Sequence, residues 1–291
     1  MSAPLARTSR NGWRISEPPP PHGVALPQTP AIRRVVANNP GPMTGNGTNS
    51  WLVDHDGGCV VIDPGSTDPA HLDALVAAAG GRPITHVILT HTHADHLAGA
   101  RPLAARLGIP VCGFHASAEP EFTPDIGLRD GDEIAGLRVL HTPGHASDHI
   151  CLESGDGIIF TGDHVMGWST TMVPPAPHGS VRQFLDSMDY LLQRGSPLLL
   201  PAHGPAIPHV KACIEGLVAH RRAREESILA LLPTEPRTLD EIVDSMYHNL
   251  RPGLRRAARL NLHAHLEKLE HDGRVRHQAE RWMKITPREA V

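Results

Sequence analysis

The sequence predicts an α/β layered domain followed by a small, mainly helical module. Before Pro233, short apolar runs alternate with turn signals and are later interleaved with helical patterns. After Pro233 the pattern changes to helical segments and a terminal pair of short strands. With 291 residues and 40% hydrophobic content, the chain is long enough to build one large core and one small one.

The elements of the larger domain are predicted from hydrophobic periodicity. Short apolar runs bounded by turn residues predict strands, and longer segments with helical spacing predict helices. Strands that first follow one another and then alternate with helices indicate sheets covered by helices. The predicted strands are 32–36, 49–54, 59–62, 86–89, 111–113, 137–141, 149–153 and 157–160, and the predicted helices are 70–79, 95–107, 181–193 and 214–232.

Prolines are concentrated near the N-terminus, at positions 18–21, 27 and 30. Because proline donates no backbone hydrogen bond and fixes its own φ, residues 1–30 are predicted to form an extended leader, with ordered structure beginning near Ile32. The larger domain is then expected to span residues 31–220.

The remaining residues, 221–291, read as a winged-helix module. Three helical segments followed by a ribbon are expected after about Pro233. Thr238, with Glu241 three residues later, is a capping-box signature that opens a helix over 238–249. A second helix is predicted over 254–272, ending at Gly273, and short strands are predicted over 274–276 and 281–285.

Composition excludes several classes of protein. The formal charge of −4 gives no whole-chain reason to expect binding to nucleic acid or an anionic membrane. The four cysteines, Cys59, Cys112, Cys151 and Cys213, form no closely spaced pair, which argues against a disulfide framework and a cysteine-based zinc site. No apolar run approaches the length of a membrane span. We therefore expect a cytoplasmic protein with no membrane partner.

The strongest chemical signal is the segment Thr90-His91-Thr92-His93-Ala94-Asp95-His96, directly after an apolar strand. A loop at a strand end directs several side chains to one rim of a sheet. Three imidazoles and one carboxylate supply the nitrogen and oxygen donors that suit zinc. His91 and His93 can bind one ion, and Asp95 and His96 can serve a second.

Three further loops add donors in the same way. Each follows an apolar run that is predicted to end at the same rim, and each ends in one metal-binding residue. Any one of these residues alone could be a surface or core group, but the joint pattern of four loops indicates one site. The added donors are His145 in H-T-P-G-H, Asp163 in T-G-D and His203 in P-A-H-G.

This combination of H-T-H-A-D-H, G-H, G-D and A-H-G resembles the signature of the metallo-β-lactamase superfamily over roughly residues 32–220. The resemblance implies an αββα sandwich with a binuclear site at one sheet edge. It also implies a ligand set: His91, His93 and His145 for the first ion, Asp95, His96 and His203 for the second, and Asp163 as the bridge.

A closer resemblance extends to nearly the whole chain. Asn38-Asn39-Pro40-Gly41-Pro42-Met43, Gly47-Thr48-Asn49 and the later Gly162–Gly167 and Ser169–Thr171 segments are similar to beta-lactamase-like proteins with a C-terminal winged-helix domain. Animal members of that group include endoribonucleases. The resemblance therefore implies αββα and winged-helix domains in one chain.

The implied cofactors are two divalent metal ions, with zinc expected. Their charge acidifies a bridging water, so that the resulting hydroxide can act as the nucleophile. Asp95 is the candidate catalytic residue, because it can both bind a metal and orient this hydroxide. His149 and His164 are candidates for orienting a ligand or donating a proton, although packing roles are open for both.

The substrate is left open among several hypotheses. Between positions 251 and 284 there are nine Lys or Arg and four Asp or Glu, a local charge of +5, and a face of α-helical arginines could contact phosphates. Cleavage of single-stranded RNA is the favoured hypothesis, and hydrolysis of a small-molecule ester or thioester, as in glyoxalase II, is the alternative. The candidate phosphate contacts are Arg251, Arg255, Arg256 and Arg259.

Other functions are also considered. A mono-iron dioxygenase shares many of these ligands, and a non-catalytic winged-helix regulator would require that ligands be lost, which they are not. Antibiotic hydrolysis is disfavoured because lactamases of this fold generally lack an aspartate at the position of Asp163. The basic helix could instead form a solvated face, with the module closing the site or forming a homodimer.

Overall fold

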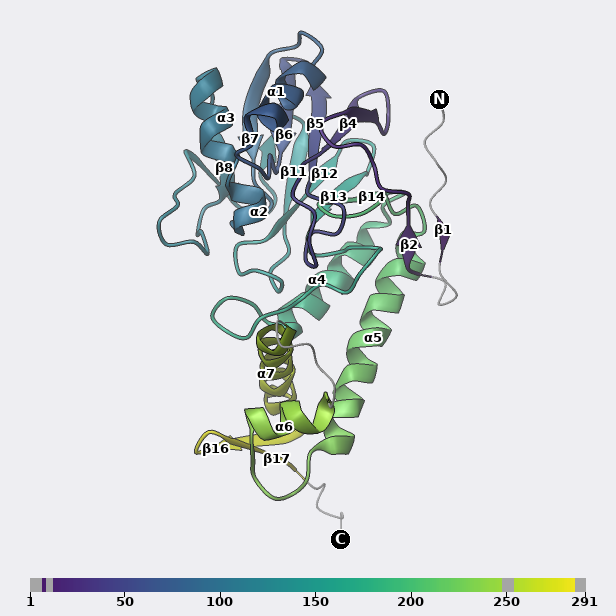
Figure 1. The fold of residues 1–291 in the computed structure, drawn as a ribbon, viewed down its shortest axis with the longest axis vertical. Coiled ribbons are helices and arrows are strands. Elements are labelled where there is room, and N and C mark those ends of the chain that lie inside the picture. Colours follow the sequence, from purple (N-terminus) through teal and green to yellow (C-terminus); the bar gives the residue numbers. More distant parts are fainter. Residues whose placement is uncertain (1–6, 9–12, 248–253, 286–291) are drawn as a thin grey trace.

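The structure is a computed structural model, and it describes residues 7–8, 13–247 and 254–285. Two β-sheets lie face to face with helices on both outer surfaces, and a smaller unit extends from one end (Figure 1). This arrangement confirms the predicted α/β class and the αββα sandwich.

The larger sheet has the strand order β3-β4-β5-β6-β7-β8-β9. Neighbours are antiparallel from β3 to β6 and parallel from β6 to β9. Helices α1 (Pro69–Ala78), α2 (Ala94–Leu97) and α3 (Ala100–Leu107) follow its strands along the chain. The strands are β3 Ala25–Pro27, β4 Ile32–Val36, β5 Asn49–His55, β6 Gly58–Ile62, β7 Ile84–Ile88, β8 Val111–Phe114 and β9 Ile126–Leu128.

The smaller sheet has the order β10-β11-β12-β13-β14 and is covered by α4 (Val181–Arg194) and α5 (Val210–Leu231). Strands β13 and β14 are parallel, whereas β10 to β13 are antiparallel. As a result β11, β13 and β14 all end at the same edge. The strands are β10 Glu133–Ile134, β11 Leu137–His141, β12 Ile150–Ser154, β13 Ile159–Gly162 and β14 Leu199–Pro201.

Alternation of side chains along each strand builds three layers of core. In β6, Val60 and Ile62 face the other sheet, whereas Cys59 and Val61 pack under α1 and α3. This follows from the two-residue repeat of a strand, since both faces of the sheets are buried. Between the sheets, Trp51 meets Phe160 edge to face with ring centroids 5.9 Å apart. The sandwich therefore holds the strand ends at fixed positions.

The prediction that ordered structure begins near Ile32 is wrong. Strand β2 (Ile15–Ser16) precedes β3, and β3 pairs with β4 as an edge strand of the larger sheet. Ile15 is buried and donates its backbone N–H to the carbonyl of Gly167. Glu17 accepts a bidentate ion pair from Arg34. Proline is compatible with an edge strand because one side of the edge needs no donors.

The single helix predicted over 95–107 is two helices, α2 and α3. The break falls at Gly99, where a Cβ atom would lie 2.5 Å from the carbonyl oxygen of Ser66. Only glycine allows this close approach, so the contact between the two loops fixes the break.

The C-terminal unit contains α6 (Leu239–Met246), α7 (Arg255–His271) and a three-stranded sheet of order β15-β17-β16. The capping box of Thr238 and Glu241 is present. Of the three helical segments predicted after Pro233, the described residues contain α6 and α7, and the end of α5, which precedes Pro233, packs with them. The predicted end of the helix at Asn249 lies outside the described residues. The strands are β15 Arg237–Thr238, β16 Val275–Gln278 and β17 Arg281–Lys284.

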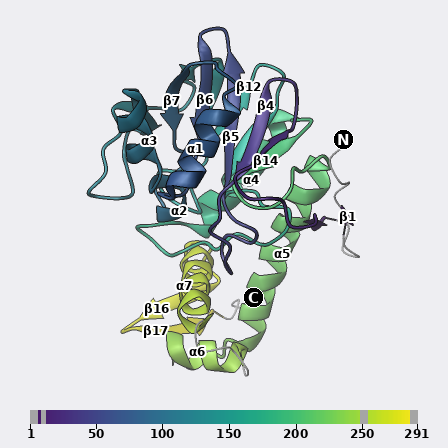
Figure 2. The same cartoon turned by 45° about the horizontal axis from the view of Figure 1, so that its top comes forward.

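Helix α5 is continuous from the sandwich into this unit (Figure 2). Its early residues pack under the smaller sheet, whereas Ile228, Leu229 and Leu232 join the core of α6, α7 and Trp282. The expected domain boundary at residues 220–221 therefore falls inside one helix, which joins the two cores mechanically.

No helix in the described part of the chain combines the length and apolar character that a bilayer span needs. All four cysteines are buried and unpaired.

Candidate metal centre

The structure brings the seven predicted donors together at one edge of the sandwich. The loops that carry them follow β7, β11, β13 and β14, and these strands end at the same rim. Asp95 and His96 lie on the short helix α2, in the same loop as His91 and His93. The sandwich topology thus gathers residues that are up to 112 positions apart in sequence, from His91 to His203.

The first group consists of His91, His93 and His145. His93 Nδ1 lies 2.9 Å from His91 Nε2 and 2.9 Å from His145 Nε2. The opposite nitrogen of His145 donates to the Met172 carbonyl at 2.7 Å, so its Nε2 carries a lone pair. A single proton on His93 can satisfy only one of the two Nε2 atoms. Tetrahedral zinc holds nitrogen ligands about 3.3 Å apart for Zn–N bonds of about 2.05 Å, close to this geometry.

The second group consists of Asp95, His96 and His203. Asp95 Oδ2 lies 3.2 Å from His203 Nε2 and 3.7 Å from His96 Nε2. His96 donates its other nitrogen to Asp63 Oδ2 at 2.9 Å, and His203 Nδ1 faces the Gly47 carbonyl at 3.3 Å. Both imidazoles therefore direct Nε2 at the cluster.

Asp163 lies between the two groups. Its Oδ1 faces His203 Nε2 at 3.2 Å and His96 Nε2 at 3.6 Å, whereas its Oδ2 faces His145 Nε2 at 3.6 Å. Each carboxylate oxygen thus points to a different group of donors. This is the geometry that a bridging carboxylate needs.

Burial and charge set the protonation states at this site. Burial lowers the pKa of His91 well below its usual value and that of His145 to about 4, so both imidazoles are neutral near pH 7, the form that binds metals. Burial opposes ionisation of Asp163, but His203 and His96 outweigh it and hold its pKa well below the usual range. Burial likewise opposes ionisation of Asp95, and His96 and His203 bring its pKa to about 2.

The donor set fits a pair of divalent cations. Among the described residues, His96 Nε2, His203 Nε2 and Asp163 Oδ1 are buried polar atoms without any hydrogen-bond partner. Burying such atoms unpaired is costly, and all three face the cluster. Nitrogen and carboxylate donors together suit zinc and related first-row metals.

Sequence reasoning missed Asp63, which orients part of the site. It accepts hydrogen bonds from the Thr90 backbone N–H at 2.8 Å and the Thr90 hydroxyl at 2.6 Å, in addition to His96. These bonds stabilise a left-handed backbone at Asp63, where φ is 49°. The available signal was its position directly after β6, at the same strand-end location as the recognised donors.

The loop with the Asn39 and Thr48 motif holds the second group in place. Thr48 is fixed by two hydrogen bonds with the Asn39 side chain, and its hydroxyl donates to the Asp95 carbonyl at 3.1 Å. Asn49 Nδ2 donates to the carbonyls of Pro201 at 2.9 Å and Gly204 at 2.8 Å, on both sides of His203. These hydrogen bonds explain why polar residues occupy positions 39, 48 and 49.

Gly144 is required by the approach of α4 to the His145 loop. Its φ is 143°, and a Cβ atom there would lie 2.4 Å from Phe184 Cα. The Ser187 hydroxyl and the Ser180 backbone N–H donate to the carbonyls of Pro143 and Gly144 at 2.9 Å. Helix α4 therefore fixes the backbone that carries His145.

His149 and His164 are both fully buried beside the donors. The His149 ring lies 5.1 Å from the His91 ring and 5.4 Å from the His164 ring. Burial lowers the pKa of His164 to about 3. Their burial favours an orienting or packing role over donation of a proton to a leaving group.

Two of the four candidate phosphate contacts, Arg255 and Arg259, are ion-paired within the described part of the chain. Arg251 lies outside the described residues. Arg255 forms ion pairs with Asp244 and Asp240, and Arg259 pairs with Asp240 at 3.2 Å. Arg256 is exposed. Acidic side chains on α6 therefore neutralise much of the charge counted in the sequence.

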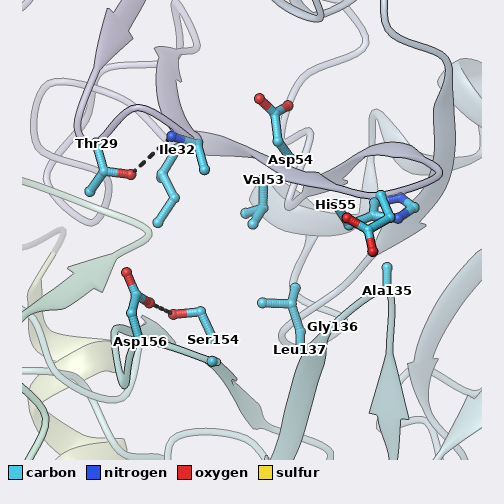
Figure 3. A pocket seen from close by; sticks show the side chains of 13 residues that line it. Thr29, Ile32, Val53, Asp54, His55, Ala135, Gly136, Leu137, Ser154 and Asp156 are labelled. Carbon is cyan, nitrogen blue, oxygen red and sulfur yellow. Dashed lines mark hydrogen bonds between the residues drawn. The ribbon is translucent and has the colours of Figure 1, made fainter.

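A separate pocket lies at the opposite end of the strands. It has a volume of about 470 Å³ and is lined by Thr29 and by residues 31–32, 53–56, 135–137 and 154–156, with Asp54 and Asp156 at its wall (Figure 3). None of the seven donors lines it, and Asp54 is paired with Arg33. Substitutions in this pocket are therefore expected to leave the seven donors in place.

The fold and the clustered donors define an αββα metallohydrolase class, and comparison with known proteins specifies the family. Residues 43–203 match the Metallo-beta-lactamase superfamily, and residues 238–282 match the Beta-lactamase associated winged helix domain. The chain belongs to the metallo-beta-lactamase superfamily and is a hydrolase of that fold with a C-terminal winged-helix domain.

Two relatives indicate the range of this family. The chain is 29% identical over 270 residues to the Beta-lactamase-like protein 2 homolog of Drosophila melanogaster, covering 85% of this chain and 90% of the relative. It is 31% identical over 235 residues to the Atrochrysone carboxyl ACP thioesterase of Aspergillus chevalieri, covering 75% and 74%. The first relative, together with the winged-helix match at residues 238–282, confirms the expected group.

Solved structures support the same fold. A metallo-beta-lactamase family protein from Thermus thermophilus superposes with a TM-score of 0.74 at 26% identity, covering 88% of this chain and 99% of that one. Another structure, of a protein in a di-iron-bound form, has a TM-score of 0.51 at 27% identity and covers 64% and 96%.

The first prediction concerns metal content. Seven donors exceed the needs of one tetrahedral centre, so the purified protein should bind two divalent ions per chain. Inductively coupled plasma mass spectrometry, after dialysis against excess zinc, measures the number of zinc ions bound per chain. Saturation at a single ion would contradict this expectation.

The second prediction concerns the bridge. Asp163→Asn preserves shape but removes the charge that two cations share, so it should weaken binding of at least one ion and lower hydrolysis by about 10-fold or more. Calorimetric zinc titration and initial rates measure both effects. Asp156→Asn, in the distant pocket, is the matched control and should behave as the wild type. Equal behaviour of the two variants would exclude a bridging role.

Proposed function

We propose that this protein is a binuclear metallohydrolase that cleaves an activated ester or thioester. The observation that carries the binuclear assignment is Asp163, whose two oxygens face two separate groups of donors. The first group would be the ligands of one ion and the second group those of the other. The proposed ligands are His91, His93 and His145, then Asp95, His96 and His203, with Asp163 shared.

We propose zinc as the metal. The five imidazoles and two carboxylates include no cysteine, and this combination also suits iron or manganese. A structural relative described as di-iron-bound makes iron the main alternative. A mono-iron dioxygenase would leave the second group of donors unused.

When bound, the ions would supply an acidified water as nucleophile and a positive charge that stabilises the oxyanion of the substrate. Asp95 is the residue proposed to orient the attacking water. Its side chain is 29% exposed, compared with 10% for Asp163 and 0% for His96 and His203. A carboxylate with a pKa of about 2 accepts a hydrogen bond at neutral pH without being protonated itself.

A cysteine nucleophile is disfavoured. All four cysteines are buried, and burial raises the pKa values of Cys112, Cys151 and Cys213 to about 12. A thiol with such a pKa holds almost no thiolate at neutral pH. The same unpaired cysteines support the proposal of a reducing compartment, such as the cytoplasm.

Two observations support the proposed substrate class: the ion pairs of the arginines on α7, and the name of one similar protein. Arg255 and Arg259 form ion pairs with Asp240 and Asp244, so less positive charge is free to attract an RNA backbone than the sequence suggested. A similar protein is named as a thioesterase of an acyl carrier protein. Together these observations favour ester or thioester cleavage over cleavage of RNA.

Cleavage of single-stranded RNA is the second candidate. It is supported by the winged-helix match and by the +5 charge between residues 251 and 284, of which Arg256 and Arg276 are exposed. Exposed ion pairs contribute little to stability, so phosphates could displace the aspartates from their arginines. Homodimerisation through the same module stays a prediction.

The third prediction separates these substrates. The zinc-loaded protein should hydrolyse S-lactoylglutathione or another acyl thioester, and the Asp163→Asn variant should lose this activity. The quadruple variant Arg251→Glu, Arg255→Glu, Arg256→Glu and Arg259→Glu should keep the wild-type kcat/KM for the thioester, because the metals bind in the other domain. Rates are measured on both variants and on a fluorogenic RNA.

The opposite pattern would favour RNA. In that case the wild type would cleave RNA with an affinity that falls steeply with salt, and the quadruple variant would show a shallower salt slope. Thioester turnover no faster than that of Asp163→Asn would exclude the thioester proposal. Bis(p-nitrophenyl) phosphate, too small to reach the arginines, controls for misfolding of the quadruple variant.

A further inference from the structure

A buried cationic side chain connects the winged-helix domain to the metal centre. Arg221, on the part of α5 between the two cores, is 3% exposed. Its guanidinium donates to the Thr171 carbonyl and to Asn261 Oδ1 on α7, the latter at 3.3 Å. His265 of α7 lies 3.5 Å from the same guanidinium. One side chain therefore contacts both domains and the loop after Asp163.

The loop held by Arg221 positions two of the proposed ligands. The Thr171 hydroxyl donates to the Asp163 carbonyl at 2.7 Å, and the carbonyl of the next residue, Met172, accepts from His145 Nδ1 at 2.7 Å. The second bond determines which nitrogen of His145 faces the cluster. Residues 171 and 172 thus act on a ligand of the first group and on the bridge.

Phe184 provides a second connection. The Arg221 guanidinium lies 5.0 Å from the centre of the Phe184 ring, and that ring lies 4.5 Å from the ring of His164, the neighbour of Asp163. Phe184 is also the residue against which Gly144 packs. The guanidinium therefore contacts Phe184, the side chain that packs beside the backbones of Asp163 and His145.

Burial of the positive charge of Arg221 is unfavourable for folding. Burial lowers the pKa of Arg221 to about 10. Within the described ranges, no carboxylate lies within ion-pair distance of Arg221, although Glu225, one turn further along α5, favours its charge. The direct partners of the guanidinium are a carbonyl, an amide oxygen and an aromatic face. An apolar residue would fill a purely structural position at lower cost.

We propose that Arg221 is a positioning residue that transmits docking of the winged-helix domain to the geometry of His145 and Asp163. This inference rests on the proposed binuclear centre and goes beyond it by giving the winged-helix domain a role in metal binding. Without the guanidinium, the 171–172 segment loses its anchor, and the two ligands lose the bonds that aim them at the metals.

The fourth prediction is that Arg221→Met weakens zinc binding by about 10-fold or more, as for other losses of groups that orient metal ligands. Arg221→Lys keeps the charge and should recover part of the affinity. Thr171→Val removes the bond to the Asp163 carbonyl without disturbing α7, and it should also weaken binding. Competition with a chromophoric chelator measures zinc affinity, and circular dichroism measures the melting temperature of each variant.

Lys268→Met is the matched control. Lys268 pairs with Glu225 at 2.8 Å in the same interface between α5 and α7, but it does not contact the 171–172 loop. This variant should be less stable than the wild type and yet bind zinc with wild-type affinity. A purely structural role of Arg221 predicts instead that affinity follows the melting temperature in all variants.

The outcomes distinguish this inference from the proposed function. Wild-type zinc affinity in folded Arg221→Met, or in Thr171→Val should Arg221→Met fail to fold, would overturn the positioning role alone. Equal loss of affinity in Lys268→Met would also overturn it. If the wild-type protein binds no divalent ion, the metallohydrolase proposal fails, and the role of Arg221 fails with it.

Discussion

The fold is organised around a cluster of metal-binding side chains whose nitrogen and oxygen atoms are buried without enough hydrogen-bond partners. Nitrogen atoms of His91, His93 and His145 face one another at hydrogen-bond distance, although they have too few protons to share. Nearby, the Nε2 atoms of His96 and His203 and one oxygen of Asp163 have no hydrogen-bond partner among the described residues. Such burial is unfavourable unless positive charge occupies the centre. We therefore expect this centre to bind cations.

The surrounding scaffold maintains this arrangement by contacting the second ring nitrogen of three of the candidate ligands. Asp63 holds His96, the Met172 carbonyl holds His145, and the loop at Gly47 holds His203. These partners come from both sheets, so they stay in register only while the sandwich is intact. Through Arg221, the winged-helix domain joins the same support, which explains how a distant domain could influence the centre.

The sequence identified side chains that the fold brings together, because each lies in a short local motif at a strand end. It could not predict partners that depend on tertiary contact. Arg221 lies 50 residues from Thr171 and reads as one more arginine of an exposed helix. The break at Gly99 depends on the carbonyl of Ser66, and the N-terminal segment is ordered by pairing of β3 with β4. In the same way, Asp240 and Asp244 neutralise arginines that looked free in the sequence.

One carboxylate, that of Asp163, is proposed to join two ions in a single centre. X-ray absorption spectroscopy of the fully zinc-loaded protein tests it most directly, because scattering between neighbouring metals reports their separation. We expect a metal–metal distance of about 3.5–4 Å, as in other bridged two-metal sites. The metal–metal scattering should be lost in Asp163→Asn. Two bound ions with no metal–metal scattering, or a wild-type signal in Asp163→Asn, would contradict it.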